Sequence, residues 1–197
     1  MIKILIIRLS SIGDIVLTTP VVRCIRKAMP DAEIHYLTKK EYAPLLRSNP
    51  YITKLWLFEN NFRELIPRLR AERFSHIADL HKNLRSLYLR LMLRRPSAGF
   101  PKLNIKKWML TKMKIDLLPN KHIVDRYFRA VQKLGVRNDG QGLDYFIAPG
   151  EEVDPEVLPE THRNGYFVFV IVGRHNTKMF PAERVAGIET DRRPEIW

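Results

Sequence analysis

The stretch Ile4-Leu5-Ile6-Ile7-Arg8-Leu9-Ser10-Ser11-Ile12-Gly13-Asp14-Ile15-Val16 decides the fold. It opens with an unbroken apolar run rich in β-branched side chains, which is typical of a strand buried on both faces. A small polar turn follows, and then four apolar residues recur at helical spacing and predict one helix. These residues are Ile15, Val22, Ile25 and Met29. Strand, turn and helix in this order predict an α/β sheet with a ligand site at the carboxyl ends of its strands.

Asp14 stands where this helix is expected to begin, and two interpretations of it are open. As the N-cap it would accept backbone N–H groups and stabilise the helix by about 1 kcal/mol. As a general base at the mouth of a cleft it would take a proton from a ligand hydroxyl. Spacing alone favours the cap. The turn is not a dinucleotide-binding fingerprint, because Gly13 is its single glycine.

The composition indicates a globular protein with anionic partners. The chain has 34 basic against 21 acidic residues, a net charge of +13 and a pI near 10. Such a surface favours nucleic acid, an anionic membrane or a phosphorylated glycolipid. Its single cysteine, Cys24, fits a reducing compartment. With no leader segment and no apolar run of membrane-spanning length, we expect a cytoplasmic protein that at most touches the inner face of the cytoplasmic membrane.

Strand-like and helix-like segments alternate along the first 147 residues. The alternation predicts parallel β-α-β units and a doubly wound, Rossmann-like sheet with helices on both faces. Expected strands are 33–37, 54–58, 75–80, 98–100 and 143–146, and expected helices are 40–47, 62–72 (with Asn61 as its cap), 84–93 and 122–134. The basic segment 103–114 is either a solvated helix or an element that faces a membrane or glycolipid.

A proline-rich, acidic segment divides the chain. Residues 148–165 are predicted to be a linker between a first domain, 1–147, and the start of a second domain, 166–197. The second part opens with an apolar strand at 166–172, and a helix follows from Pro181.

Several motifs, taken in order, resemble the ADP-heptose:lipopolysaccharide heptosyltransferases of glycosyltransferase family 9. The most specific is K-I-L-I-I-R-L-S-S-I-G-D-I-V-L-T-T-P at residues 3–20. The resemblance continues through 30–34, 49–52, 79–86, 122–127 and 178–184, and it covers the chain to about residue 187.

The resemblance implies a GT-B glycosyltransferase with two Rossmann-like halves facing a cleft. The N-terminal half holds the acceptor, an anionic lipopolysaccharide core glycolipid, and the C-terminal half holds the donor, ADP-heptose. Transfer of heptose inverts the anomeric centre and needs no metal or other cofactor. By resemblance, Asp14 is the catalytic base that deprotonates the acceptor hydroxyl. The residues implied near the donor phosphates are Ser10, Ser11, Gly13, Thr177 and Lys178.

Acceptor recognition falls, by the same resemblance, to a cluster of polar residues. These are His81, Lys82, Asn83, Arg85 and Arg126. The competing interpretation of residues 81–85 is a helix cap with solvated charges. For Arg126 it is a surface ion pair with Asp125, which would contribute little, and for Lys178 it is an exposed loop lysine.

The sequence departs from the family after the first strand, loop and partial helix of the donor half. We therefore expect a truncated chain that is inactive alone. The alternative function is a non-catalytic module that binds an anionic glycolipid through the acceptor half. A nucleic-acid-binding domain ranks last, since no RNP, KH or zinc motif is present and no nucleic acid is expected as a partner. The six histidines show no metal-ligand spacing.

Overall fold

The computed structural model describes residues 1–101, 112–114, 121–152, 154–157 and 159–162. The chain divides into two units, Met1–Glu151 and Glu152–Trp197. The described elements of the second unit are two short 3₁₀ turns, η5 (Pro155–Val157) and η6 (Glu160–His162). The predicted strand at 166–172, the helix from Pro181 and the site residues Thr177 and Lys178 lie outside the described residues, as does most of the basic segment 103–114. The linker and the incomplete second domain stay predictions.

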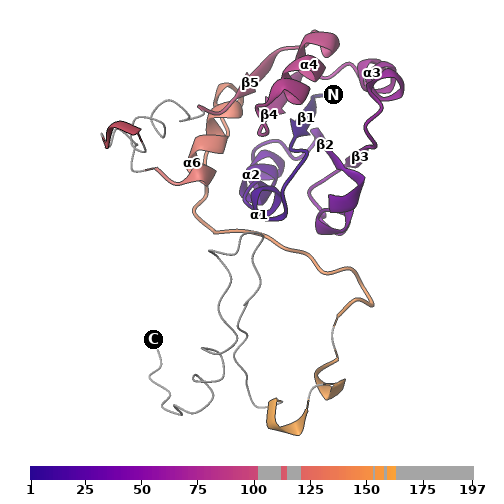
Figure 1. Cartoon of the computed structure of the whole chain (residues 1–197), viewed down its shortest axis with the longest axis vertical. Helices are drawn as coiled ribbons and strands as arrows, with labels where there is room; N and C mark the ends of the chain where they lie inside the picture. Colours follow the sequence, from indigo (N-terminus) through magenta and orange to yellow (C-terminus); the bar gives the residue numbers. More distant parts are fainter. Residues whose placement is uncertain (102–111, 115–120, 153, 158, 163–197) are drawn as a thin grey trace. The chain divides into compact units, whose positions relative to one another are not determined.

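Five parallel strands form one sheet in the first unit, in the order β3-β2-β1-β4-β5 (Figure 1). The strands are β1 (Lys3–Ile7), β2 (Glu33–Lys39), β3 (Lys54–Phe58), β4 (His76–Asp79) and β5 (Ser97–Gly99). The predicted Rossmann-like α/β sheet is confirmed. Its strand order reverses beside β1, which has β2 on one side and β4 on the other. In open α/β sheets, ligands bind at the carboxyl ends of strands at this switch point.

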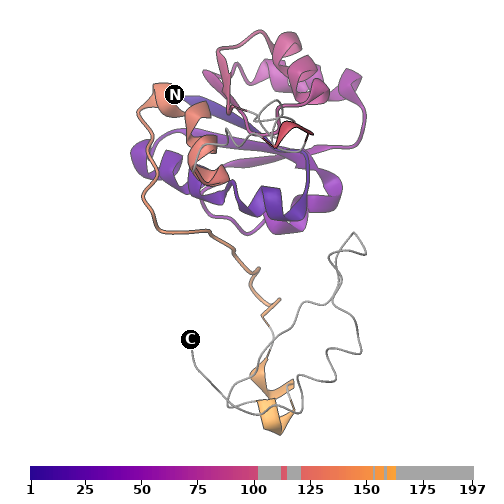
Figure 2. The same ribbon diagram turned by 60° about the vertical axis from the view of Figure 1, so that its left-hand side comes forward.

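Helices cover both faces of the sheet (Figure 2). They are α1 (Ile12–Val16), α2 (Thr19–Ala28), α3 (Phe62–Ala71), α4 (Leu84–Leu93) and α6 (Ile123–Tyr127). Ile4 and Ile6 of β1 pack with α1, α2 and α6, whereas Leu5 and Ile7 pack with α3 and α4. The apolar run is continuous because each of its faces meets a layer of helices.

The structure differs from the sequence expectation at the first helix. One helix was expected through Ile15 and Met29, but α1 ends at Val16 and α2 begins at Thr19. Pro20, the second residue of α2, cannot donate a backbone N–H and its ring clashes with the preceding turn of a continuing helix. The chain therefore starts a new helix at a proline that suits a first turn.

The structure also decides three other expectations within the first unit. Asn61 caps α3 through backbone N–H groups of Arg63 and Glu64, as expected. The expected helix 122–134 is α6 followed by two 3₁₀ turns, η3 (Phe128–Ala130) and η4 (Gln132–Leu134), and it stops at Gly135 with φ +75°. The segment 40–47 is the 3₁₀ helix η1 (Lys40–Leu45).

The expected strand 143–146 is wrong, because a buried arginine holds the segment before it against α2. Arg23 is 3% exposed and donates to both carboxylate oxygens of Asp139 at 3.0 and 2.8 Å and to the Gly142 carbonyl. It also pairs with Asp144. Arg23 and Lys27 hold the pKa of Asp139 well below its usual range. These bonds hold an irregular backbone, and within the described part of the chain residues 143–146 pair with no strand.

Candidate functional site

The turn after β1 places Asp14 in the first turn of α1 and not at its cap. Ser11 is the N-cap, with extended backbone angles of φ −101° and ψ −176°. Its hydroxyl donates to Asp14 Oδ2 at 3.0 Å instead of capping a backbone N–H. The N-cap interpretation of Asp14 is therefore wrong, because the helix begins two residues before it. The peptide bond between Ser10 and Ser11 is cis.

Arg8 holds the same carboxylate from the end of β1. It directly follows β1, its side chain is 9% exposed, and it forms an ion pair with Asp14 Oδ2. Its other terminal nitrogen donates to the Leu80 carbonyl at 2.6 Å. Asp14 itself keeps 41% of its side chain exposed, and among the described residues no hydrogen bond or ion pair reaches its Oδ1. Within the described ranges, Oδ2 is thus anchored by two side chains, whereas Oδ1 keeps its acceptor positions for a ligand.

Three adjacent strands bring their ends to this point. Arg8, Leu80 and Phe100 are the residues that follow β1, β4 and β5, which lie side by side in the sheet. Tyr127 of α6 lies over them, with the Arg8 guanidinium 5.9 Å from its ring centre and the Phe100 ring at 4.8 Å. Burial raises the pKa of the Tyr127 phenol, so this hydroxyl stays neutral beside the ion pair.

A buried carboxylate organises the loop between β4 and α4. Asp79 is 1% exposed, and its Oδ1 accepts the backbone N–H groups of His81 and Lys82 at 3.1 and 2.7 Å. Its Oδ2 accepts the Ser86 hydroxyl at 2.9 Å and lies 3.5 Å from Arg90. Asp79 therefore shapes the loop from inside and does not face a ligand.

The predicted acceptor residues in this loop have different environments. Asn83 caps α4 in a capping box with Ser86, so the cap interpretation is confirmed for it. The Asn83 amide also donates to His81 Nε2 at 2.7 Å. Lys82 has φ +50° and donates to the Phe100 carbonyl at 2.8 Å. Arg85 is exposed on the first turn of α4.

Arg126 of α6 lies beside the residues that follow β5. Its guanidinium is 5.7 Å from the Phe100 ring centre and donates to the Pro101 carbonyl. The competing interpretation of Arg126, an ion pair with Asp125, is wrong: Asp125 accepts a hydrogen bond from the Asn138 amide instead. Phe100 thus contacts both Lys82 and Arg126. Because Phe100 follows β5, these two predicted acceptor residues lie at the same carboxyl edge of the sheet as Asp14.

The turn also leaves open space. A side chain added at Gly13 would meet no atom within 4 Å, so packing within the described chain does not demand a glycine there. Ser10 is half-buried, whereas Ser11 and Gly13 are exposed. The predicted donor-phosphate residues of the first domain are therefore accessible to a ligand at the carboxyl edge.

A hollow beside the α1–α2 turn lies apart from these residues. A cavity of about 340 Å³ is bounded by the α1–α2 turn, the start of α6 and residues 138–143. Its lining is mainly apolar, with Leu17, Pro20 and Leu143, and none of the predicted site residues contributes to it. Because chemistry needs the ionised and polar groups, we place the candidate site at the strand ends and not in this cavity.

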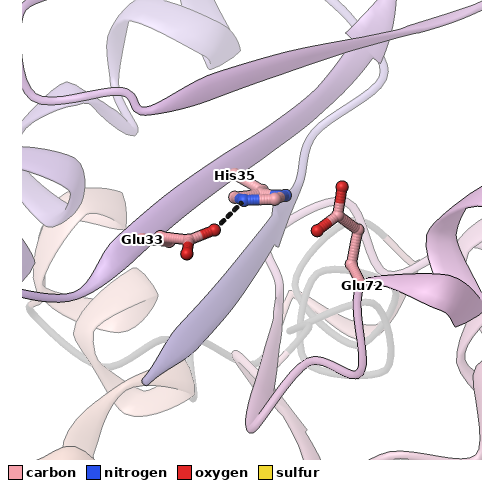
Figure 3. A group of neighbouring side chains, drawn as sticks. All are labelled: Glu33, His35 and Glu72. Carbon is pink, nitrogen blue, oxygen red and sulfur yellow. Dashed lines mark hydrogen bonds and ion pairs between the residues drawn. The ribbon is translucent and has the colours of Figure 1, made fainter. Parts of the chain in front are cut away.

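One group of three possible metal ligands occurs among the described residues, at the opposite ends of the strands. Glu33 and His35 of β2 and Glu72 after α3 have ligand atoms within 4.8 Å of one another (Figure 3). The Lys3 ammonium lies between the two carboxylates, where a metal ion would have to bind, with its Nζ 3.0 Å from Glu33 and 3.0 Å from Glu72. His35 Nδ1 accepts the Trp56 N–H at 3.0 Å, so Nε2 carries the proton and donates to Glu33 at 3.2 Å. The group is an ion-pair network and not a metal site.

Sequence reasoning missed Arg8 and Asp79. Arg8 carried a usable signal, because a charged residue at the end of a run buried on both faces requires a partner. Asp79 had a weaker one, as an acidic residue at a strand end shortly before a helix.

Comparisons with known proteins agree on one group of enzymes. Lipopolysaccharide heptosyltransferase 1 of Campylobacter coli is 28% identical over 134 residues, which cover 64% of this chain and 39% of that protein. A glycosyl transferase of family 9 from Veillonella parvula superposes with a TM-score of 0.58 at 25% identity, covering 74% of this chain and 45% of the other. An Escherichia coli heptosyltransferase solved with ADP gives a TM-score of 0.57 at 18% identity, covering 74% and 51%.

These findings confirm the resemblance to the family 9 heptosyltransferases and the Rossmann-like fold. No protein-family model matches the chain. The chain spans about 40% of the length of the curated relative and about half that of the solved ones. Among the described residues, no helix has the length and apolarity that crossing a bilayer requires.

Proposed function

We propose that the first domain is the acceptor-binding half of a glycosyltransferase that moves heptose from ADP-heptose to an anionic lipopolysaccharide core glycolipid. The observation that carries this proposal is the state of Asp14. Its Oδ2 is held by Ser11 and Arg8, while its Oδ1 meets no hydrogen-bond or ion-pair partner in the part of the chain that the structure describes. A carboxylate in this position can accept the proton of a hydroxyl as that oxygen attacks the donor carbon.

The polar residues around this edge support the acceptor assignment. Lys82 and Arg126 converge on Phe100, and the exposed Arg85 lies in the first turn of α4. We assign His81, Lys82, Asn83, Arg85 and Arg126 to recognition of an anionic sugar, with Asn83 acting through its hold on His81. Cations of this kind stabilise phosphate or carboxylate groups by charge and by directed N–H donors.

The donor is assigned from the relatives and from the open turn. Relatives of this chain include a heptosyltransferase solved with ADP. We propose that the backbone at Ser10, Ser11 and Gly13 lies against the donor phosphates and that Thr177 and Lys178 contribute from the second part of the chain. Because the chain spans 39% of the curated relative, we propose that the 197-residue polypeptide does not transfer sugar by itself.

A chimera tests this function directly. Residues 1–147 replace the corresponding part of the Campylobacter coli heptosyltransferase 1, and transfer from ADP-heptose to a core acceptor is measured. We expect activity in the chimera and a fall in kcat of about 10²-fold or more for Asp14→Asn, with little change in acceptor affinity. Equal losses in kcat and affinity would assign Asp14 a binding role.

The same experiment separates the second candidate, a non-catalytic module that binds an anionic glycolipid. The basic charge of the chain favours that function as well. A folded chimera that binds the acceptor but transfers no heptose, and whose Asp14→Asn variant behaves identically, would favour the module and contradict the enzyme.

A further inference from the structure

The outward face of α4 is apolar, which is unusual for a surface helix. Leu84, Leu87, Tyr88 and Leu91 are 84%, 45%, 44% and 59% exposed. Their spacing of three, four and seven residues places them on one stripe. The inward face of the same helix buries Leu89 and Leu93 against the sheet. A helix that is apolar on both faces normally has a second apolar partner.

The neighbouring helix α3 meets the stripe at Tyr88, which packs edge-on against Phe62 with 5.2 Å between the ring centres. α3 packs on the same face of the sheet, and its exposed residues are mostly charged and of both signs, such as Arg63, Glu64 and Arg68. Polar outward faces of this kind are solvated. A helix on this face of the sheet can therefore present charged residues to solvent, so the exposed leucines of α4 need a separate explanation.

The surroundings of the stripe are basic. Arg85, Arg94 and Arg95 are exposed along α4 and just beyond its end. No acidic residue occurs in the sequence between Leu80 and Ile115. Leucines with a tyrosine on one face and arginines beside them match the interfacial zone of an anionic bilayer, where apolar side chains enter the acyl boundary and guanidinium groups meet phosphates.

We propose that α4 docks the domain on an anionic lipid bilayer, lying in the plane of the membrane surface with Leu84, Leu87, Tyr88 and Leu91 inserted. This proposal rests on the proposed function, since a glycolipid acceptor is presented by such a surface. α4 begins next to the loop that carries His81 and Lys82. Docking through α4 therefore brings the acceptor edge to the level of the lipid headgroups.

Vesicle binding tests the proposal with the whole 197-residue chain. The vesicles contain phosphatidylethanolamine and phosphatidylglycerol, or phosphatidylcholine alone, and no glycolipid, and binding is measured by cosedimentation. We expect binding to the anionic vesicles only. The double variant Leu87→Ser/Leu91→Ser, and separately Arg94→Asn/Arg95→Gln, should each weaken it by about tenfold or more. Asparagine is chosen at Arg94 because its φ is +50°.

Matched controls separate the stripe from general stickiness and charge. Ile147→Ser/Val157→Ser removes two other apolar side chains that are 54% and 77% exposed, and Arg63→Gln removes a charge from α3. Both controls should keep full vesicle binding, and circular dichroism should show all variants folded. Unchanged vesicle binding in both α4 variants, or loss in the controls to the same extent, would overturn the proposal.

Two further results would also overturn it. Absence of binding to anionic vesicles while the soluble acceptor still binds would remove the membrane role and leave the proposed function standing. Conversion of an oligomer to a monomer by Leu87→Ser/Leu91→Ser, without any vesicle binding, would make this face a contact between copies of the chain.

Discussion

At the scale of single residues, the candidate site depends on one buried cation. Arg8 takes its position from β1, reaches the carbonyl after β4 and pairs with Asp14 on α1. A planar guanidinium can serve two acceptors in different directions, whereas an ammonium concentrates its charge at one point. In the proposed function Arg8 is a positioning residue, because its contact with a ligand runs through Asp14.

Replacing Arg8 by lysine separates positioning from binding. Arg8→Lys in the chimera should lower kcat by about tenfold or more and change the acceptor KM less, because the lysine cannot hold Leu80 and Asp14 together. It should also lower the free energy of unfolding by about 1–3 kcal/mol through the unsatisfied buried carbonyl. Kinetics and urea unfolding measure both effects. Arg47→Lys, at an exposed position, is the control, and an unchanged kcat would contradict the role of Arg8.

At the scale of elements, the sequence predicted most of the features that local pattern determines. The apolar run of β1, the Asn61 cap of α3 and the bounds of α4 depend on periodicity and capping chemistry, which neighbouring residues set. The strand at 143–146 failed because Arg23, far away in sequence, fixes the adjacent backbone. Similarly, the ion pair between Asp14 and Arg8 could not be predicted, since the two side chains meet only in the folded sheet.

The network at the amino ends of β1 and β2 predicts how stability depends on pH. Burial lowers the pKa of His35 below its ordinary value, so the unfolded chain takes up a proton first as the pH falls. The stabilisation is fully present above about pH 6.5 and decreases below it. Hydrogen bonds from Lys54 and Lys3 lower the pKa of Glu72 to about 2, so its own contribution is lost only in stronger acid.

We therefore expect the melting temperature to fall between about pH 7.5 and pH 5.5, and to fall less in His35→Gln. Glutamine can keep a donor toward Glu33 but does not titrate. Differential scanning fluorimetry across this range measures the difference. His122→Asn is the matched control, because His122 is exposed and asparagine also suits its capping position. Identical pH profiles for the wild type and His35→Gln would refute the assignment to His35.

At the scale of the whole molecule, charge and site lie in the same half. The chain carries a net charge of +13, and Lys82, Arg85 and Arg126 belong to the first domain together with Asp14. The acceptor side of the proposed function is therefore available in that domain. The proposed donor side consists of the turn 10–13 and of Thr177 and Lys178 in the second part of the chain.

Binding to the 197-residue polypeptide should reflect this asymmetry. A deacylated anionic core oligosaccharide should bind mainly through charge, so raising the salt from about 0.1 M to about 1 M, which shortens the Debye length from about 10 Å to about 3 Å, should weaken it by about tenfold. ADP-heptose should bind only in the millimolar range or weaker, about −4 kcal/mol, because the turn 10–13 together with Thr177 and Lys178 supplies too few contacts to fix a nucleotide sugar.

Calorimetry of both ligands with matched variants decides between charge at the site and charge in general. Arg85→Gln and Arg126→Gln should each weaken acceptor binding and reduce its salt dependence, because they remove cations beside the acceptor edge. Lys133→Gln is the control, because it removes one exposed positive charge at the other end of the strands. Lys133 follows Ala130, whose carbonyl lies 2.8 Å from the ring of His76 at the amino end of β4. This variant should change neither the affinity for the acceptor nor its salt dependence. Micromolar ADP-heptose binding would contradict the proposal that the donor side is incomplete in this polypeptide. Equal effects of all three variants on acceptor binding would contradict an acceptor site beside Asp14.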